Sequence, residues 1–156
     1  MTAKDRYLEF LDALNRQDLE AAARFVDTSV YAEDCVGFTG GFVGWDEAVA
    51  SVRRVWRGIP DLRAAPHQVV AEGGVVLARL TVSGTNSGWL FGAPPTGRRY
   101  EASMFDSVEI DDAGLIVRRV QQADALGQFR QLFGPSLVVA GAVAAGSFAA
   151  LGGALL

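Results

Sequence analysis

The spacing of hydrophobic residues changes at about residue 65 of the chain. Before that point, hydrophobic side chains recur at every third or fourth position, as at Tyr7, Phe10, Leu11 and Leu14. This spacing lines one face of an α-helix. The first part of the chain is therefore predicted to be mainly helical.

Three helices are expected in this first part. Thr2 and Asp5 form a capping-box pattern ahead of the first helix. Asp18 is placed to cap a short second helix, and Asp46 a third that ends at about Gly58. Between the second and third helices, residues 30–44 are rich in glycine and aromatic residues, which predicts a strand and a loop.

After residue 65 the hydrophobic residues alternate with polar ones, which is typical of β-strands. Four strands are predicted, over residues 67–72, 75–85, 100–110 and 115–123. Short turns that contain glycine separate the first from the second and the third from the fourth. Helices followed by an antiparallel meander predict an α+β fold: a curled antiparallel sheet with the N-terminal helices packed over its concave face, as in a cone or α+β barrel.

The composition suits a single globular domain. The 156 residues are 50% hydrophobic and 21% charged. A net charge of −4 and scattered basic residues argue against a nucleic-acid partner, because phosphate binding needs a concentrated basic surface. The single Cys35 and the single His67 give no metal-ligand spacing, so no metal site is expected. The polar start of the chain shows no secretory signal, and the cytoplasm is the expected compartment.

Residues 136–156 contain no charged side chain and are rich in Ala and Gly. Their number is close to the roughly 20 residues that span a bilayer, but large apolar side chains are few. Small residues recur at every fourth position, as at Gly141, Ala145 and Ala149, and this spacing permits close helix packing. We expect a domain of residues 1–134, followed by an apolar helix or tail of residues 135–156 that packs on the domain or on a second subunit. Membrane contact through this tail is the less favoured alternative.

The strand predicted over residues 100–110 has one apolar face that carries an ionisable group. Tyr100, Met104 and Asp106 share this face with aliphatic residues, whereas the other face is more polar. Asp106 is therefore expected to point into a pocket. There desolvation would raise the pKa of a carboxyl group and suit it to exchange protons with a substrate. A buried ion pair with Arg79, or a hydrogen bond to Tyr100, accounts for the same pattern equally well.

The strand predicted over residues 115–123 does not reveal its inward face. Val120, Gln122 and Asp124 lie on one face, Gln121 and Ala123 on the other, and composition barely separates the two. Asp124 also precedes a predicted final helix that begins at Ala125, so it has a structural role open to it as a helix cap.

Several short motifs resemble, in their order and spacing, those of a known family. They are Ile59–Leu62, Gly84–Asn86, Gly88–Gly92, Pro94–Arg98, Ala113–Ile116, Asp124 and Gln131–Leu132. Residues 5–134 as a whole resemble the SnoaL-like polyketide cyclases of the ketosteroid-isomerase-like and nuclear-transport-factor-like superfamily. The resemblance implies an α+β cone that is commonly oligomeric and uses no metal or organic cofactor. It also implies an Asp as the acid/base of an intramolecular aldol closure. Asp124 matches that Asp, which would turn Gln122 and Val120 inward as well.

The chain departs from the family pattern where the family often has histidines. Phe38 and Asn86 occupy two such positions, and the sequence Arg118-Arg119-Val120 stands where the family often has Glu-His-Trp. We therefore expect a pocket that is more apolar than those of the family's type members. Relatives in this family include hydroxylases, epoxide-opening enzymes and proteins that shape a polyene for cycloaddition.

These observations favour a cyclase or isomerase of a hydrophobic polyketide-like intermediate in secondary metabolism. Asp124 is the expected acid/base and Asp106 the second carboxylate. Side chains that could donate to a developing oxyanion are Gln122, Asn86 and Tyr100. The other expected substrate contacts are Val120, Met104, Arg79, Trp56, Trp89, Phe91 and Phe38. The expected partners are a hydrophobic small molecule and further copies of the chain, in a dimer or a larger oligomer.

Three alternatives remain open at this point. An epoxide-opening enzyme would use Arg79 to bridge Asp106 and Asp124. A cycloaddition-shaping cyclase would depend on the form of the pocket. A non-catalytic module would bind a hydrophobic ligand without converting it.

Overall fold

The computed structural model describes residues 1–36 and 40–134 of the chain. The predicted tail of residues 135–156 and the predicted site residue Phe38 lie outside the described residues. Within the described ranges, no helix has the length and apolar character that a membrane span requires.

Three of the helices come before the long strands. Helix α1 (Ala3–Asn15) begins with the predicted capping box, in which the Asp5 backbone N–H donates to Thr2 Oγ1 at 3.2 Å and the Thr2 N–H donates to Asp5 Oδ2 at 2.9 Å. Helix α2 (Leu19–Ala23) has the predicted Asp18 cap. Helix α3 (Trp45–Gly58) begins two residues earlier than predicted, because Gly44, at a φ of 98°, serves as its N-cap in place of Asp46, which lies in the first turn.

The strands form one curled six-stranded sheet in the order β2-β1-β6-β5-β4-β3. Its members are β1 (Ala32–Val36), β2 (Gly40–Val43), β3 (Arg63–Glu72), β4 (Val75–Thr85), β5 (Arg99–Ile110) and β6 (Ile116–Ala123). All neighbouring pairs are antiparallel except β1 and β6, which run parallel. The parallel pair is possible because a helix and four strands separate β1 from β6 along the chain.

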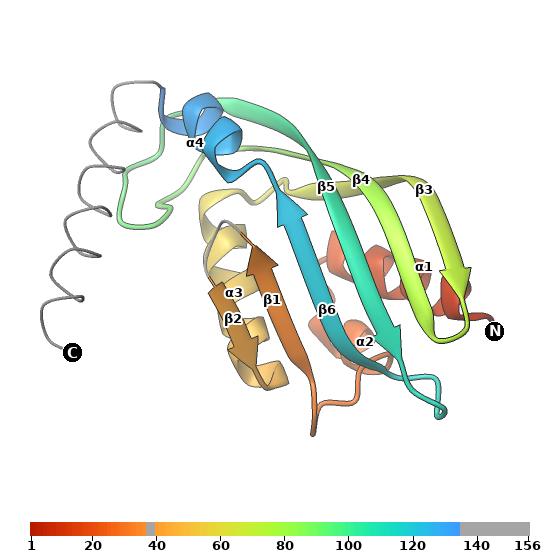
Figure 1. Ribbon diagram of the computed structural model, residues 1–156. Helices are drawn as coiled ribbons and strands as arrows, with labels where there is room; N and C mark the ends of the chain where they lie inside the picture. Colours follow the sequence, from red (N-terminus) through yellow and green to blue (C-terminus); the bar gives the residue numbers. More distant parts are fainter. Residues whose placement is uncertain (37–39, 135–156) are drawn as a thin grey trace, which may run out of the picture.

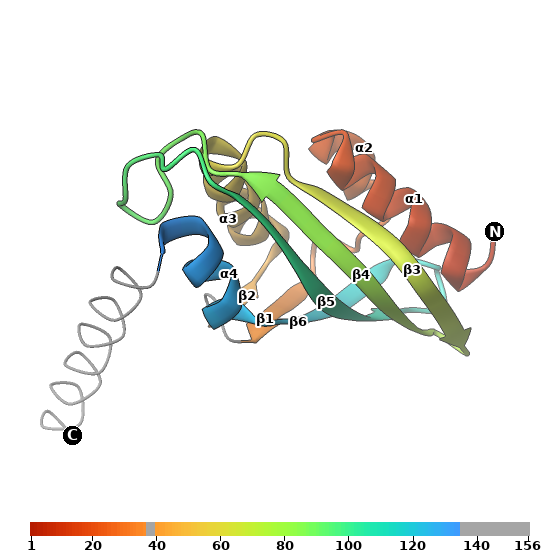
Figure 2. The ribbon, with the colours of Figure 1, turned by 90° about the horizontal axis from the view of Figure 1, so that it is seen from above.

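The concave face of the sheet carries the core. Figure 2 shows α1, α2 and α3 on this side of the sheet, while α4 (Ala125–Phe133) follows β6 at one end (Figure 1). Along β4 the burial alternates, so that Val76 and Leu80 are buried, whereas Leu77 and Arg79 lie on the exposed convex face. The predicted α+β cone with helices over its concave face is confirmed.

Candidate active site

A cavity of about 210 Å³ lies between the sheet and helices α1, α3 and α4. Its walls are mainly aliphatic and aromatic, with contributions from Phe10 and Leu14 of α1 and from Val52 and Trp56 of α3. Glu33 and Arg119 are the charged side chains among the described residues that line it. The cavity is thus an apolar chamber with one charged region on the sheet.

The pairing of β1 with β6 creates this charged region. In the parallel register, Glu33 lies opposite Arg119 and Cys35 lies opposite Gln121. All four side chains line the cavity. Two segments about 85 residues apart in the sequence therefore place a carboxylate, a guanidinium, a thiol and an amide side by side.

Arg119 is held by a buried ion pair with Asp106 of β5. Its Nε donates to both carboxylate oxygens of Asp106, at 3.0 and 3.1 Å, and its Nη2 donates to Oδ2 at 2.7 Å. The hydroxyl of Tyr7 donates to the same Oδ2 at 2.9 Å. Burial disfavours a charged Arg119, but Asp106 and then Glu33 outweigh this effect and hold the pKa of Arg119 above its usual range.

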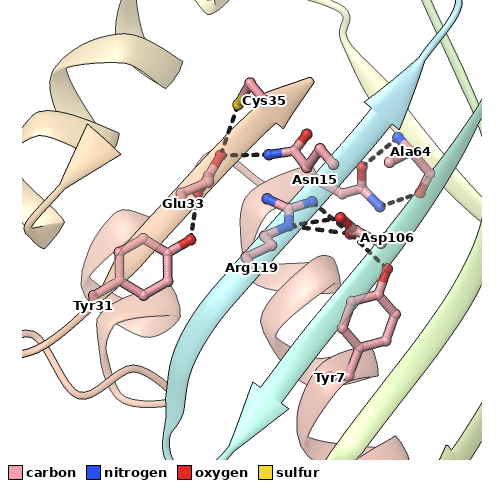
Figure 3. A network of polar contacts seen from close by, with 9 residues as sticks. Tyr7, Asn15, Tyr31, Glu33, Cys35, Ala64, Asp106 and Arg119 are labelled. Carbon is pink, nitrogen blue, oxygen red and sulfur yellow. Dashed lines mark hydrogen bonds and ion pairs between the residues drawn. The ribbon is translucent and has the colours of Figure 1, made fainter. Parts of the chain in front are cut away.

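Arg119 keeps one edge of its guanidinium open to the cavity. The ring of Phe10 covers the group, with its centroid 5.6 Å from Cζ. Nη1 takes part in none of the hydrogen bonds or ion pairs found in the described residues. In that part of the chain, every fully buried side-chain nitrogen or oxygen has a hydrogen-bond partner. Nη1 has none there, so it is not fully buried. Figure 3 shows the guanidinium between Glu33 and Asp106.

Glu33 is oriented by donors from β1, from Tyr31 just before that strand, and from β6. Tyr31 Oη donates to Oε2, and Cys35 Sγ donates to Oε1 at 3.4 Å (Figure 3). Gln121 Nε2 donates to the same Oε1. Burial and then the charge of Glu33 raise the pKa of Tyr31 above its ordinary value, which keeps its hydroxyl proton available for donation. Trp45 meets the ring of Tyr31 edge-on at 5.5 Å. Glu33 is therefore a fixed carboxylate that faces an apolar cavity.

Asp106 points inward, which confirms the expected orientation, but its partners differ from those considered. It pairs with Arg119 and Tyr7, whereas Arg79 is exposed on the convex face of β4. Asp106 lies behind Arg119 and is not part of the cavity lining. With Arg79 outside, the expected bridge between Asp106 and Asp124 is absent, so the epoxide-opening site considered for this chain loses its basis.

The expectation that Asp124, Gln122 and Val120 face the pocket is wrong. None of the three lines the cavity, and both Asp124 and Gln122 are exposed. The reason is a bulge: Ile110 pairs with Ile116 and Glu109 with Arg118, so Val117 is an extra residue in β6. An extra residue reverses which side chains face inward along the rest of the strand.

Asp124 is a helix cap in the structure. Its Oδ1 accepts a hydrogen bond from the Gly127 N–H at 2.8 Å, at the start of α4. This satisfies one of the free N–H groups of the first turn. The structural alternative considered for Asp124 is therefore present, and its proton-transfer role has no geometric support.

Asn86 anchors a loop and does not face the cavity. Its amide nitrogen donates to the carbonyl oxygens of Gly58 and Gly88, at 3.2 and 2.8 Å, and its oxygen accepts from the backbone and hydroxyl of Thr96, at 2.9 and 3.0 Å. The expected role of Asn86 as an oxyanion donor is therefore wrong, because its polar atoms are used within the loop.

The predicted aromatic and sulfur contacts divide between the wall and the surface. Trp56, Phe91, Tyr100 and Met104 line the cavity, and their contact with a substrate stays a prediction. Trp89 is 66% exposed and is not part of the lining. Burial, and then the charge of Asp61, raise the pKa of Tyr100 above its ordinary value. Within the described residues, no cluster of three or more His, Cys, Asp or Glu side chains could hold a metal ion.

Glu33, Arg119 and Gln121 were missed by sequence reasoning. Tyr31, Glu33 and Cys35 alternate along the chain, so they share one face of a strand, and this pattern could have marked Glu33 as inward. Its pairing with Arg119 has no comparable signal, because it depends on a parallel contact between distant strands.

The fold and the cavity define a class of cone-shaped α+β protein built around one apolar chamber. A sequence model of the SnoaL-like polyketide cyclases matches residues 4–132. The chain belongs to this family, so the resemblance seen in its motifs is confirmed. Family membership supports a role as a cyclase.

Solved structures agree with this assignment. TsrD from Streptomyces laurentii is 28% identical to the chain, with a TM-score of 0.71, and the match covers 84% of this chain and 94% of that one. A SnoaL-like polyketide cyclase from Agrobacterium tumefaciens strain C58 is 26% identical, with a TM-score of 0.67 and coverage of 84% and 98%. IdmH from Streptomyces antibioticus has the same fold at 23% identity, with a TM-score of 0.74 and coverage of 84% and 98%. None of the curated proteins matches the chain.

Proposed function

We propose that the protein is a cofactor-free cyclase or isomerase of a hydrophobic polyketide-like substrate, with Glu33 as its acid/base. The observation that carries this proposal is the position of Glu33, the carboxylate among the described residues that lines the apolar cavity. Family membership supports the reaction class. The homo-oligomer implied by the resemblance remains part of the proposal.

The reaction would begin with a proton transfer from carbon. Glu33 takes a proton from the carbon next to a substrate carbonyl. The electron pair of the C–H bond forms a carbon–carbon double bond, and the π pair of the carbonyl moves onto its oxygen to give an enolate. In a cyclisation, the enolate carbon then bonds to a second carbonyl carbon, and the oxygen of that carbonyl takes the proton back from Glu33. In an isomerisation, the proton returns to a different carbon.

The cavity suits this chemistry because its walls are apolar. Apolar walls hold a hydrophobic substrate and exclude water, which would otherwise solvate the enolate or compete for the proton. Hydrogen bonds from Tyr31, Gln121 and Cys35 fix the carboxylate in place, so a bound substrate meets an oriented base.

A small bicyclic ketone tests this proposal without knowledge of the natural substrate. 2-Tetralone in D₂O exchanges the hydrogens next to its carbonyl, and NMR follows the loss of their signals. The wild-type protein should accelerate this exchange, and Glu33→Gln should lower the acceleration by about 10²–10⁴-fold, the usual contribution of a general base.

The matched control is Glu109→Gln, which removes an exposed carboxylate from β5 and should leave the rate unchanged. Exchange no faster than in buffer, or equal rates for the wild type and Glu33→Gln, would contradict the proposal. A protein that binds the ketone tightly without exchanging its hydrogens would be a binding module instead.

A further inference from the structure

The edge of the Arg119 guanidinium that Asp106 does not occupy is a candidate contact for a ligand. The residue is 6% exposed, so its charge lies in the protein interior. A guanidinium has five N–H donors in one plane, and the Nε and Nη2 edge is occupied by Asp106. Nη1 faces the cavity without a partner in the described part of the chain. A donor that is open to an apolar cavity in this way is suited to an acceptor that arrives with the substrate.

Glu33 does not fill this position. It lies opposite Arg119 in the β1–β6 register and lines the same cavity. Among the described residues, however, Arg119 forms its ion pair within 4.0 Å with Asp106 and not with Glu33. The carboxylate and the free guanidinium edge are therefore neighbours that do not neutralise each other directly.

Such a pair matches the two atoms that change in an enolisation. The carbon next to the carbonyl gives its proton to Glu33, which becomes neutral, while the carbonyl oxygen becomes negative. The negative charge thus moves from Glu33 to the oxygen, and a cation beside that oxygen keeps the charge paired after it has moved. In an apolar cavity this matters, because an uncompensated charge is far less stable there than in water.

On the basis of the proposed function, we infer that Arg119 is a catalytic residue whose Nη1 binds the carbonyl oxygen of an enolisable ketone as that oxygen becomes anionic. Asp106 and Tyr7 are positioning residues. The bidentate pair and the Tyr7 hydroxyl hold the guanidinium in one orientation, and the Phe10 ring covers it. The substrate class follows: hydrophobic ketones with an acidic C–H next to the carbonyl.

2-Naphthol tests this inference independently of turnover. Its anion imitates an enolate oxygen on a flat apolar frame, and its fluorescence distinguishes the neutral and anionic forms. Glu33→Gln imitates the protonated Glu33 that exists beside the enolate. This variant should bind the naphtholate anion at least about tenfold more tightly than the wild type does, because the charge-assisted bond to Arg119 remains while the repulsion from Glu33 is gone. The pKa of the bound naphthol should fall below that of naphthol in buffer.

The matched variant adds Asp106→Asn and Arg119→Gln to Glu33→Gln. It removes both buried charges together, so neither is left without its partner. The gain in naphtholate affinity should disappear, while the affinity for 2-methylnaphthalene, which has no acceptor, should stay within about threefold. Glu33→Gln with Arg119→Lys, which keeps the charge, should recover part of the gain.

The inference is overturned if Glu33→Gln binds the anion no better than the wild type does, or if the gain persists without Arg119. This result differs from a failure of the proposed function. Tight naphtholate binding without catalysed exchange of 2-tetralone would support the role of Arg119 and refute that of Glu33. Catalysed exchange that depends on Glu33, without a preference for the anion, would refute the role of Arg119 alone.

Discussion

Arg118 and Arg119 are neighbours in the sequence, yet they lie on opposite faces of the sheet. Both form an ion pair with an aspartate of an adjacent strand. Arg118 pairs with Asp34 at 3.0 Å, and the two side chains are 51% and 46% exposed. Arg119 pairs with Asp106 at 2.7 Å, and the side chains are 7% and 0% exposed. The same chemistry thus occurs once in water and once in the protein interior.

The difference explains why the candidate site lies on the concave face. Water and salt screen the Arg118 pair, so it contributes little to stability and exerts little force on other molecules. The Arg119 pair lies in a region of low polarity, where each charge acts strongly on its neighbours. An arginine at the cavity can therefore influence a bound substrate, whereas the arginine beside it in the sequence can only affect the surface.

The largest predicted effect is on stability, and it separates the two arginines. Arg119→Met should lower the free energy of unfolding by about 3–5 kcal/mol, because it leaves Asp106 buried without its cation. Arg118→Met should lower it by about 0–1 kcal/mol, as expected for an exposed pair. Urea unfolding followed by circular dichroism measures both.

A second variant determines whether the loss comes from the unpaired charge. Replacing both members of the buried pair, with Asp106→Asn and Arg119→Gln, should recover most of the stability lost in Arg119→Met. Equal losses for Arg118→Met and Arg119→Met would contradict the contrast between the two faces.

The contrast also shows what the sequence could predict. Alternation along β5 predicted correctly that Asp106 points inward, because that strand follows the regular period of two. The same rule fails in β6, where the buried Ile116 would place Arg118 and Asp124 inward. The extra residue Val117 reverses the pattern, so Arg119, Gln121 and Ala123 line the cavity instead.

Other features of the fold followed from local chemistry. The Thr2 and Asp5 capping box, the Asp18 cap and the four long strands are short-range features, and the structure contains all of them. The boundaries of the strands are close to those predicted except in β3, which begins at Arg63 and not at residue 67. The β1–β6 contact is a long-range feature. Because it sets Glu33 beside Arg119, the central part of the site could not be predicted from local patterns.

Tyr100, on the same concave face, should have a smaller effect on stability, and this effect should depend on pH. Its pKa in the folded protein is raised by burial and then by the charge of Asp61, so its contribution to stability is present below pH 10, the ordinary pKa of tyrosine. As the pH rises above about 10, the unfolded chain loses its proton more readily than the folded protein does. Stability should then fall, by up to about 1.4 kcal/mol per pH unit for one such group.

Tyr100→Phe removes this group, so stability should fall less steeply above pH 10, by up to about 1.4 kcal/mol per pH unit. The free energy of unfolding at pH 7 should change little. In the described residues its hydroxyl forms no hydrogen bond, so the substitution removes little else. Urea midpoints measured from pH 8 to pH 11 provide the comparison. An unchanged slope would show that the hydroxyl ionises as freely in the folded protein as in the unfolded chain.

The most direct test of the account compares Glu33, whose carboxylate lines the cavity, with Asp124, whose carboxylate is exposed. Exchange of 2-tetralone is measured for the wild type, Glu33→Gln and Asp124→Asn under identical conditions. Asparagine caps a helix about as well as aspartate, so Asp124→Asn should keep the fold and a rate within about twofold of the wild type. Glu33→Gln should lose about 10²–10⁴-fold. The opposite result, in which Asp124→Asn loses the activity and Glu33→Gln keeps it, would contradict the assignment of Glu33 as the acid/base.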